Sequence, residues 1–185
     1  MCRWARGIAL LLATAVSGCI SQGPSDRSYG RAQRLLRSDP RLAEAAFQTS
    51  CRSESYGPGC TAAARLHASG QGVKQDLALA LTLFLDGCHK GDPIGCMELR
   101  DRYARGEAER DASPEAEAAF AAVVERYRSG CFSGVAQACL GAGVLMKLGW
   151  GTARNGYNGR RLIQKACAMG SPEACAEVDV SGNVP

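Results

Sequence analysis

The sequence predicts an all-α protein: a short α/α solenoid of antiparallel helix pairs stapled by local disulfides. Three observations point to this fold class. Aromatic residues make up only 6% of the 185-residue chain while hydrophobic residues make up 46%, and this Ala-, Leu- and Gly-rich composition favours closely packed helices over a β-sandwich. Cysteines recur in four close pairs, and glycines recur at a fixed distance after them. Such internal repetition is typical of folds built by stacking one unit on the next.

The first eighteen residues have the character of an export signal. Two arginines precede an apolar stretch at residues 8–16, and residues 16–19, Val-Ser-Gly-Cys, resemble a bacterial lipobox. The resemblance implies that residues 1–18 are a lipoprotein signal peptide and that Cys19 is acylated, which would anchor the chain stably through several acyl chains. Because Ile20 rather than Asp follows the cysteine, it also implies an outer-membrane lipoprotein that faces the periplasm.

Two other interpretations of this segment stay open. One is a transmembrane anchor, although about nine apolar residues are too few to span a bilayer. The other is ordinary signal cleavage after Ala13-Thr14-Ala15, which would release a secreted protein. Removal of Arg3 and Arg6 lowers the formal net charge from +4 to +2. That small charge provides no electrostatic footprint for nucleic acid, so no nucleic-acid partner is expected.

The exported chain divides into three parts. Residues 19–28 are expected to form a tether between the lipid and the folded domain, because residues 21–28 have the polar sequence SQGPSDRS. Residues 29–178 predict the solenoid, and residues 179–185 a flexible C-terminal tail. Two helices are expected before the first cysteine pair, over residues 29–36 and 41–51, with a stop and a new start at Ser-Asp-Pro between them.

Eight cysteines remain once Cys2 leaves with the signal and Cys19 is lipidated. Two cysteines eight residues apart on one continuous helix would have Cα atoms about 12 Å apart, whereas a disulfide requires about 4.4–6.8 Å. Gly or Pro residues between the partners allow the chain to reverse, and an oxidising compartment makes disulfides the default. We therefore expect four helix–turn–helix elbows, closed by Cys51–Cys60, Cys88–Cys96, Cys131–Cys139 and Cys167–Cys175.

Glycines mark the second boundary of the repeat. Gly70, Gly106 and Gly149 each follow the second cysteine of an elbow by ten residues, and Gly72 and Gly151 complete a Gly-x-Gly spacing. The unit is a cysteine, a helix, a glycine turn, a second helix and a cysteine, with a period of 36 residues in the first and third units. The middle unit is longer by seven residues, which predicts a polar loop over residues 106–114.

One face of each predicted helix carries the residues expected to form the core. Because a single helical hairpin cannot bury both of its faces, neighbouring units must stack. The expected inward positions are Leu42, Ala45, Ala46 and Phe47 before the first elbow; Ala62, Ala63, Leu66, Leu77, Ala80, Leu81 and Phe84 in unit one; Leu99, Tyr103, Ala119, Val123 and Tyr127 in unit two; and Leu140, Val144, Leu145, Leu162, Ile163 and Ala166 in unit three.

The first unit, from Cys60 to Cys88, resembles the Sel-like repeat, a relative of the tetratricopeptide repeat. The third unit is similar at Gly143, Gly149, Gly151 and residues 165–167, and the second keeps Tyr103 and Gly106. The paired cysteines resemble the secreted bacterial cysteine-rich branch, in which each pair bridges adjacent antiparallel helices. The resemblance covers about residues 41–177 and implies a concave surface that binds a partner. The matching residues of unit one are Gly70, Gly72, Val73, Asp76, Ala80 and Phe84, with His67 at a position that is usually aromatic.

No metal site, cofactor or catalytic residue is predicted. Structural zinc sites usually space cysteines as Cys-x2–4-Cys, and the motifs for haem attachment or redox exchange are absent from the sequence. His67 is expected to occupy an aromatic packing position and His89 a solvated elbow. The carboxylates near the long loop, Asp111, Glu115 and Glu117, are expected to be solvated.

An enzymatic alternative comes from the resemblance alone. Some members of the cysteine-rich branch are called β-lactamase-like, which implies a hydrolase or a penicillin-binding protein. That chemistry uses Ser-x-x-Lys with a later Lys-Thr-Gly, and neither motif occurs in the sequence. The main prediction is therefore an exported, lipid-anchored helical-repeat scaffold. We expect its concave surface to bind an envelope protein or a peptidoglycan component.

Overall fold

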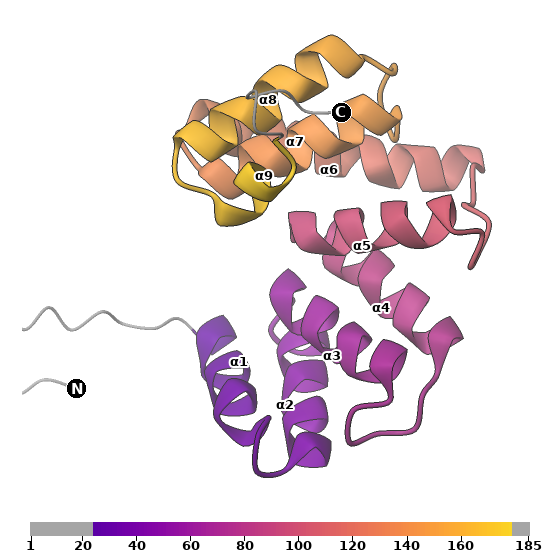
Figure 1. The fold of residues 1–185 in the computed structure, drawn as a ribbon, viewed down its shortest axis with the longest axis vertical. Helices are drawn as coiled ribbons and strands as arrows, with labels where there is room; N and C mark the ends of the chain where they lie inside the picture. The colour runs from indigo at the N-terminus through magenta and orange to yellow at the C-terminus, as the bar shows by residue number, and fades with distance from the viewer. Residues whose placement is uncertain (1–23, 179–185) are drawn as a thin grey trace, which may run out of the picture.

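The computed structural model describes residues 24–178, which form nine α-helices and no β-strand (Figure 1). Helices adjacent in the sequence pack against each other as antiparallel pairs, except α5 and α6, which barely touch and instead both pack on α7. The predicted all-α solenoid of helix pairs is confirmed. The helices are α1 (Pro24–Leu35), α2 (Pro40–Arg52), α3 (Gly57–Ser69), α4 (Leu77–His89), α5 (Pro93–Ala104), α6 (Pro114–Phe132), α7 (Ala136–Leu148), α8 (Gly156–Ala168) and α9 (Pro172–Ala176).

The first helix begins five residues earlier than the sequence indicated. α1 starts at Pro24, so residues 24–28, which we expected to belong to the tether, are helical. The ring of Tyr29 packs against Phe47 of α2 and against Tyr56 just before α3, with ring centroids 5.4 and 5.3 Å apart. α1 is thereby part of the packed solenoid. The predicted lipidation site, Cys19, and the predicted tail lie outside the described residues.

Side-chain caps explain where most helices begin. A Ser, Asp or Asn side chain accepts a hydrogen bond from a backbone N–H of the first turn in six of the described helices, and four of these six also carry Pro in the first turn. Such a cap satisfies a donor that has no partner inside the helix. The capping residues are Asp39, Asp76, Asp92, Ser113, Asn155 and Ser171.

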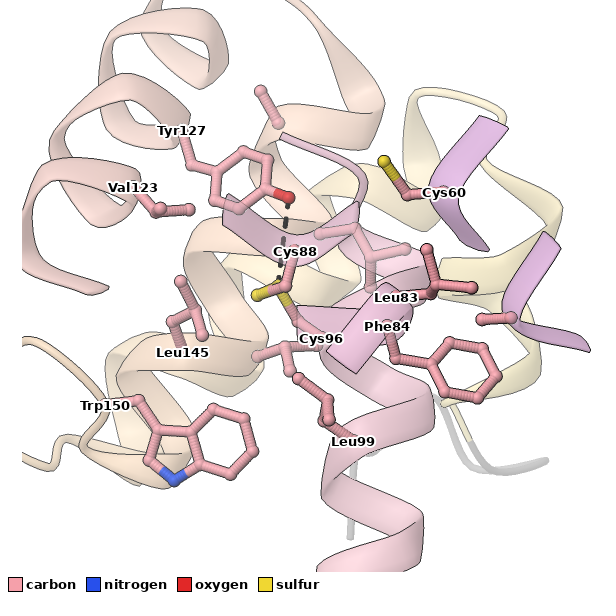
Figure 2. Packing of buried hydrophobic residues seen from close by; sticks show 14 of the residues in the cluster. Cys60, Leu83, Phe84, Cys88, Cys96, Leu99, Val123, Tyr127, Leu145 and Trp150 are labelled. Atoms are coloured by element: carbon pink, nitrogen blue, oxygen red, sulfur yellow. Dashed lines mark hydrogen bonds between the residues drawn. A yellow bond between two sulfur atoms is a disulfide. The ribbon is translucent and has the colours of Figure 1, made fainter. Parts of the chain in front are cut away.

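All four disulfides join the expected partners, with Cα–Cα distances of 4.5–4.7 Å. Each closes a short elbow, and a short loop of this kind contributes about 2–3 kcal/mol in the entropic account of cross-links. Three of the four lie in the core, while Cys175 of the last pair is exposed. Cys96 is also approached by the hydroxyl of Tyr127 on α6, at 3.9 Å from its Sγ (Figure 2).

The core is continuous along the solenoid, and aromatic residues join its halves. Figure 2 shows Phe84 and Leu99 on one side of the Cys88–Cys96 disulfide and Leu145 and Trp150 on the other. Trp150, in the turn between α7 and α8, contacts the rings of Phe120 and Tyr103 with centroids 5.3 and 5.7 Å apart. The side chains of α5, α6 and the α7–α8 turn therefore pack as one cluster.

Three expected inward residues lie on the surface instead. Leu42 is 52% exposed, Leu77 is 47% exposed, and Ala45 is exposed as well. On α2 the buried stripe consists of Ala43, Phe47, Ser50 and Cys51, so the expected face was rotated by about one residue. Leu77 is the first residue of α4, where no neighbouring helix covers it. The other expected inward positions are buried or half-buried.

His89 does not occupy a solvated elbow. Its ring is half-buried and meets Phe120 edge to face at 4.9 Å, because α6 packs across the elbow between α4 and α5. Burial lowers the pKa of His89, against the opposing charge of Asp86. His67 is also half-buried, and its Nε2 lies 3.1 Å from a carboxylate oxygen of Glu44 on α2.

The five turn glycines, Gly70, Gly72, Gly106, Gly149 and Gly151, all have positive φ angles. Gly70 and Gly149 end α3 and α7 in the left-handed conformation, which glycine adopts without strain. At Gly151 a Cβ would lie 2.2 Å from the backbone nitrogen of Ala121 on α6. This turn thus packs directly on the backbone of the preceding unit.

We predict that Gly151→Ala destabilises the fold far more than Gly106→Ala. Both glycines have positive φ, so either alanine incurs about 1–2 kcal/mol of backbone strain. A Cβ at Gly106 meets nothing within 4 Å, whereas at Gly151 it overlaps backbone atoms of α6, which raises the expected loss to about 3 kcal/mol or more. Urea unfolding of the oxidised proteins measures both losses. Equal losses would show that the close approach at Gly151 is unimportant.

Candidate partner-binding groove

The odd-numbered helices form an inner row, in which α3 contacts α5 and α5 contacts α7. In Figure 1 the two ends of the row, α1 and α9, lie at the left of the view, and α5 lies to their right at a height between them. Two hollows of about 590 and 400 Å³ follow this row. They share Tyr29, Ala62 and Arg65 as lining residues and so form one continuous surface.

We call this surface the inner groove. It extends from α1 and α2 over α3 and α5 to the first turns of α7 and α9. Its lining residues are Tyr29, Gln33, Leu36, Phe47, Tyr56, Pro58, Thr61, Ala62, Arg65, Leu66, Ala68, Ser69, Gln71, Gly91, Asp92, Pro93, Ile94, Glu98, Arg102, Gln137 and Glu173.

Charged side chains of the inner groove are paired with one another across adjacent helices. Arg65 of α3 donates from Nε to Glu98 of α5 over 2.9 Å. Arg102 lies 3.8 Å from the same carboxylate, donates to Glu107 over 2.8 Å and stacks over the ring of Phe84. Arg65 is more than half exposed, and ion pairs at the surface contribute little to stability. Their effect here is to present a polar wall that can exchange hydrogen bonds with a bound chain.

The far end of the inner groove is built from carboxylates that tie α9 to the solenoid. Glu173 accepts hydrogen bonds from Gln137 of α7 over 2.7 Å and from the Ser171 hydroxyl over 3.1 Å. The hydrogen bond from Gln137 is the main cause of the lowered pKa of Glu173. Glu177, just beyond α9, forms a two-pronged ion pair with Arg100 of α5 at 2.7 and 2.9 Å.

One of the carboxylates near the long loop after α5, Glu117, makes specific contacts, although we expected it to be solvated. Glu117 is half-buried, pairs with Arg110 and accepts a hydrogen bond of 2.9 Å from the backbone N–H of Gly151. The contact with Arg110 is the main cause of the lowered pKa of Glu117. Asp111 and Glu115 are exposed, as expected.

The residues predicted from sequence and those that line the inner groove are different sets. The eight paired cysteines and five glycines build the elbows and turns, and none of them lines the inner groove. A signal for the groove was visible only in part, as the Glu98/Arg102 spacing of four residues on one helix. Over residues 24–178 there is no cluster of three or more His, Cys, Asp or Glu side chains that could hold a metal ion.

Asp92 places an acidic group beneath the floor of the inner groove. The residue is 6% exposed, and its Oδ1 accepts a hydrogen bond of 3.1 Å from the backbone N–H of Ile94 at the start of α5. Burial raises the pKa of Asp92 above its ordinary value, and this outweighs the hydrogen bonds it accepts. Ionisation of Asp92 is therefore less favourable in the folded protein than in the unfolded chain.

We predict that Asp92→Asn stabilises the protein at neutral pH. Asparagine retains an oxygen that can cap α5 and removes the buried charge. Because the folded pKa of Asp92 is raised, the penalty of its ionisation is absent below pH 3.8 and grows as pH rises through the folded pKa. The stability difference between variant and parent should follow this rise, as measured by urea unfolding at several pH values.

A matched control is Asp76→Asn, since Asp76 caps α4 in the same way but is exposed. Because water solvates the exposed carboxylate of Asp76, the control should not stabilise the protein at neutral pH. If Asp92→Asn is less stable than the parent at neutral pH, the helix cap needs the charge and the prediction is wrong.

No helix within the described part of the chain has the length and apolar character needed to cross a membrane. The chain matches no protein-family model. It is also similar to no curated protein.

Three solved structures are similar to the chain. A protective antigen of uropathogenic Escherichia coli displaying an SLR fold is 18% identical over 82% of this chain and 32% of its own, with a TM-score of 0.49. A Sel1 repeat protein from Oxalobacter formigenes is 20% identical over 84% of this chain and 44% of its own, with a TM-score of 0.46. Helicobacter pylori cysteine-rich protein B is 19% identical over 72% of this chain and 95% of its own, with a TM-score of 0.34.

This chain therefore spans less than half of the length of the first two proteins. The Sel-like repeat and the cysteine-rich class, which the sequence motifs resemble, are both named among these similar structures.

Proposed function

We propose that the protein is an exported, lipid-anchored scaffold that binds a protein or cell-wall partner in its inner groove. The observation that supports this most directly is the continuity of the groove: hollows of about 590 and 400 Å³ share lining residues from α1 and α3 and reach α9. A surface shared by so many helices suits an extended partner, which can contact several repeats at once.

The lining residues favour a polypeptide or a similarly polar polymer. Tyr29 and Tyr56 contribute rings that combine apolar area with a hydroxyl group, and Gln33 and Gln71 add exposed amides. Gln33 and Gln71 can both donate and accept hydrogen bonds, as the backbone of a bound chain requires. Because the arginines are already paired with Glu98, the groove has no strong preference for acidic or basic partners.

The proposed location depends on the disulfides and on the signal. Four disulfides are typical of proteins in oxidising compartments such as the periplasm. The lipobox-like residues 16–19 then favour attachment to the outer membrane through Cys19. A protein held there would meet envelope proteins and peptidoglycan first.

We predict that a photo-crosslinking amino acid in the inner groove captures an envelope partner. p-Benzoylphenylalanine would replace Gln33 or Arg65, which are exposed lining residues. Thr82 and Ala122, exposed on α4 and α6, serve as control positions outside the groove. Irradiation of cells should yield a discrete adduct from groove positions, identified by mass spectrometry, and none from the controls.

A cell-wall partner would instead appear as sedimentation of the protein with purified peptidoglycan. Peptidoglycan binding that is lost on Arg65→Ala would assign the groove to that polymer. The proposed function fails if neither adducts nor peptidoglycan binding depend on groove residues.

We predict that Cys19→Ser releases the protein from membranes. The substitution removes the thiol that would carry the lipid, so the fraction pelleting with membranes should fall from nearly all to a small remainder. Radiolabelled palmitate should mark the parent and leave the variant unlabelled. Membrane association that survives the substitution would exclude Cys19 as the membrane anchor. That result would not affect the proposal that the inner groove binds a partner.

A further inference from the structure

A further hollow lies outside the inner groove, between α6 and α8. Both helices pack on α7 but barely contact each other, which leaves a space of about 850 Å³. We call it the outer cleft. Its floor and walls are Cys131 and Phe132 of α6, Ala142 and Met146 of α7, and Leu162 of α8, and its rims carry Glu125, Arg128, Ser129, Asn158, Arg161 and Lys165.

The outer cleft exposes apolar side chains of a kind that soluble proteins normally bury. Phe132 is 94% exposed, and Met146 and Leu162 are only partly covered. A concentration of exposed apolar side chains around a hollow is typical of a binding surface. Methionine adds an adaptable contact, because its unbranched side chain fills irregular gaps.

The first repeat shows what the same position looks like when it is filled. Leu83 and Leu162 each stand five residues before the next cysteine, yet Leu83 is 2% exposed. His67 occupies the position of Met146, seven residues after a cysteine, and its Nε2 reaches Glu44 of the facing helix α2. In the third repeat Met146 has no charge to pair with α6, and Met146 and Leu162 remain partly accessible.

Cations line the α8 rim of the outer cleft, at positions that are uncharged or acidic in the first repeat. Arg161 and Lys165 are exposed and lie four residues apart on α8, which places them on one face about 6 Å apart. The corresponding residues of α4 are Thr82 and Asp86. On the opposite rim Arg128 is paired with Glu125, so the net positive charge is concentrated on α8.

We propose that the outer cleft binds an amphipathic helix of a partner protein, with its apolar face on the floor and acidic residues along one edge. A helix fits between two parallel helices that lie on a third, and this is a common mode of recognition. Carboxylates one helical turn apart would match Arg161 and Lys165. The positive charge of the α8 rim favours a helix with acidic residues along this edge, because basic residues there would be repelled.

The test uses fluorescently labelled peptides of about 18 residues, or five turns, with leucine on one face and glutamate along an edge. Two control peptides carry lysine in place of glutamate, or the same composition in scrambled order. Anisotropy with the oxidised full chain should show the acidic helix binding about tenfold more tightly than either control peptide.

Protein variants then locate the site. Lys165→Asp, which introduces the residue type found at Asp86 of the first repeat, should weaken binding by about tenfold. Lys74→Asp makes the same charge change at an exposed position outside both surfaces and should leave binding unchanged. Phe132→Ser removes exposed apolar surface without disturbing the core, and it should also weaken binding.

Several results would overturn the proposal. Equal binding of the acidic and basic helices, or equal weakening by Lys74→Asp and Lys165→Asp, would show attraction to overall charge alone. Phosphatidylglycerol vesicles that bind in a Lys165-dependent way, without binding of the acidic helix, would assign the cleft to a lipid surface. A dimer in sedimentation that dissociates on Phe132→Ser would assign it to a second copy of this chain.

Discussion

The rest of the structure depends on how closely the chain approaches itself at each elbow. The paired cysteines hold two helix backbones with Cα atoms 4.5–4.7 Å apart, and only small residues fit beside them. A Cβ on Gly95 would lie 2.8 Å from the backbone nitrogen of Cys88, and one on Gly59 would lie 2.8 Å from the side chain of Ser50. Since a disulfide restrains mainly the unfolded chain and these glycines allow the contact in the folded one, the two features work together.

The periodic features of the fold could be predicted because they follow from geometry that a sequence displays directly. Cysteines eight or nine positions apart cannot bond along one helix, so the chain must reverse between them. Asp or Ser before Pro marks a helix start at Asp39, Asp92 and Ser113. The buried face of α2 was predicted less well. It is rotated from the expected face, since the small Ala43 is fully buried and the larger Leu42 is half exposed.

The inner groove and the outer cleft could not be predicted, since they depend on which helices approach each other across repeats. Arg65 and Glu98 are 33 positions apart and Arg100 and Glu177 are 77 apart, and no spacing rule connects such residues. His89 shows the same difficulty. Its elbow is exposed when the α4–α5 hairpin is considered alone, and it becomes half-buried only because Phe120 of the following unit covers it.

The two surfaces differ in how the repeats contribute to them. Along the inner groove, successive helices use different residues, so each repeat can be adapted separately to one stretch of an extended partner. At the outer cleft the third repeat differs from the first: His67 and the buried Leu83 of the first unit become Met146 and the accessible Leu162 of the third. The third unit still folds because Gly143 and Gly159 bring α7 and α8 into direct backbone contact, which anchors α8 without help from α6. The close packing of α7 on α8 therefore allows a gap between α6 and α8.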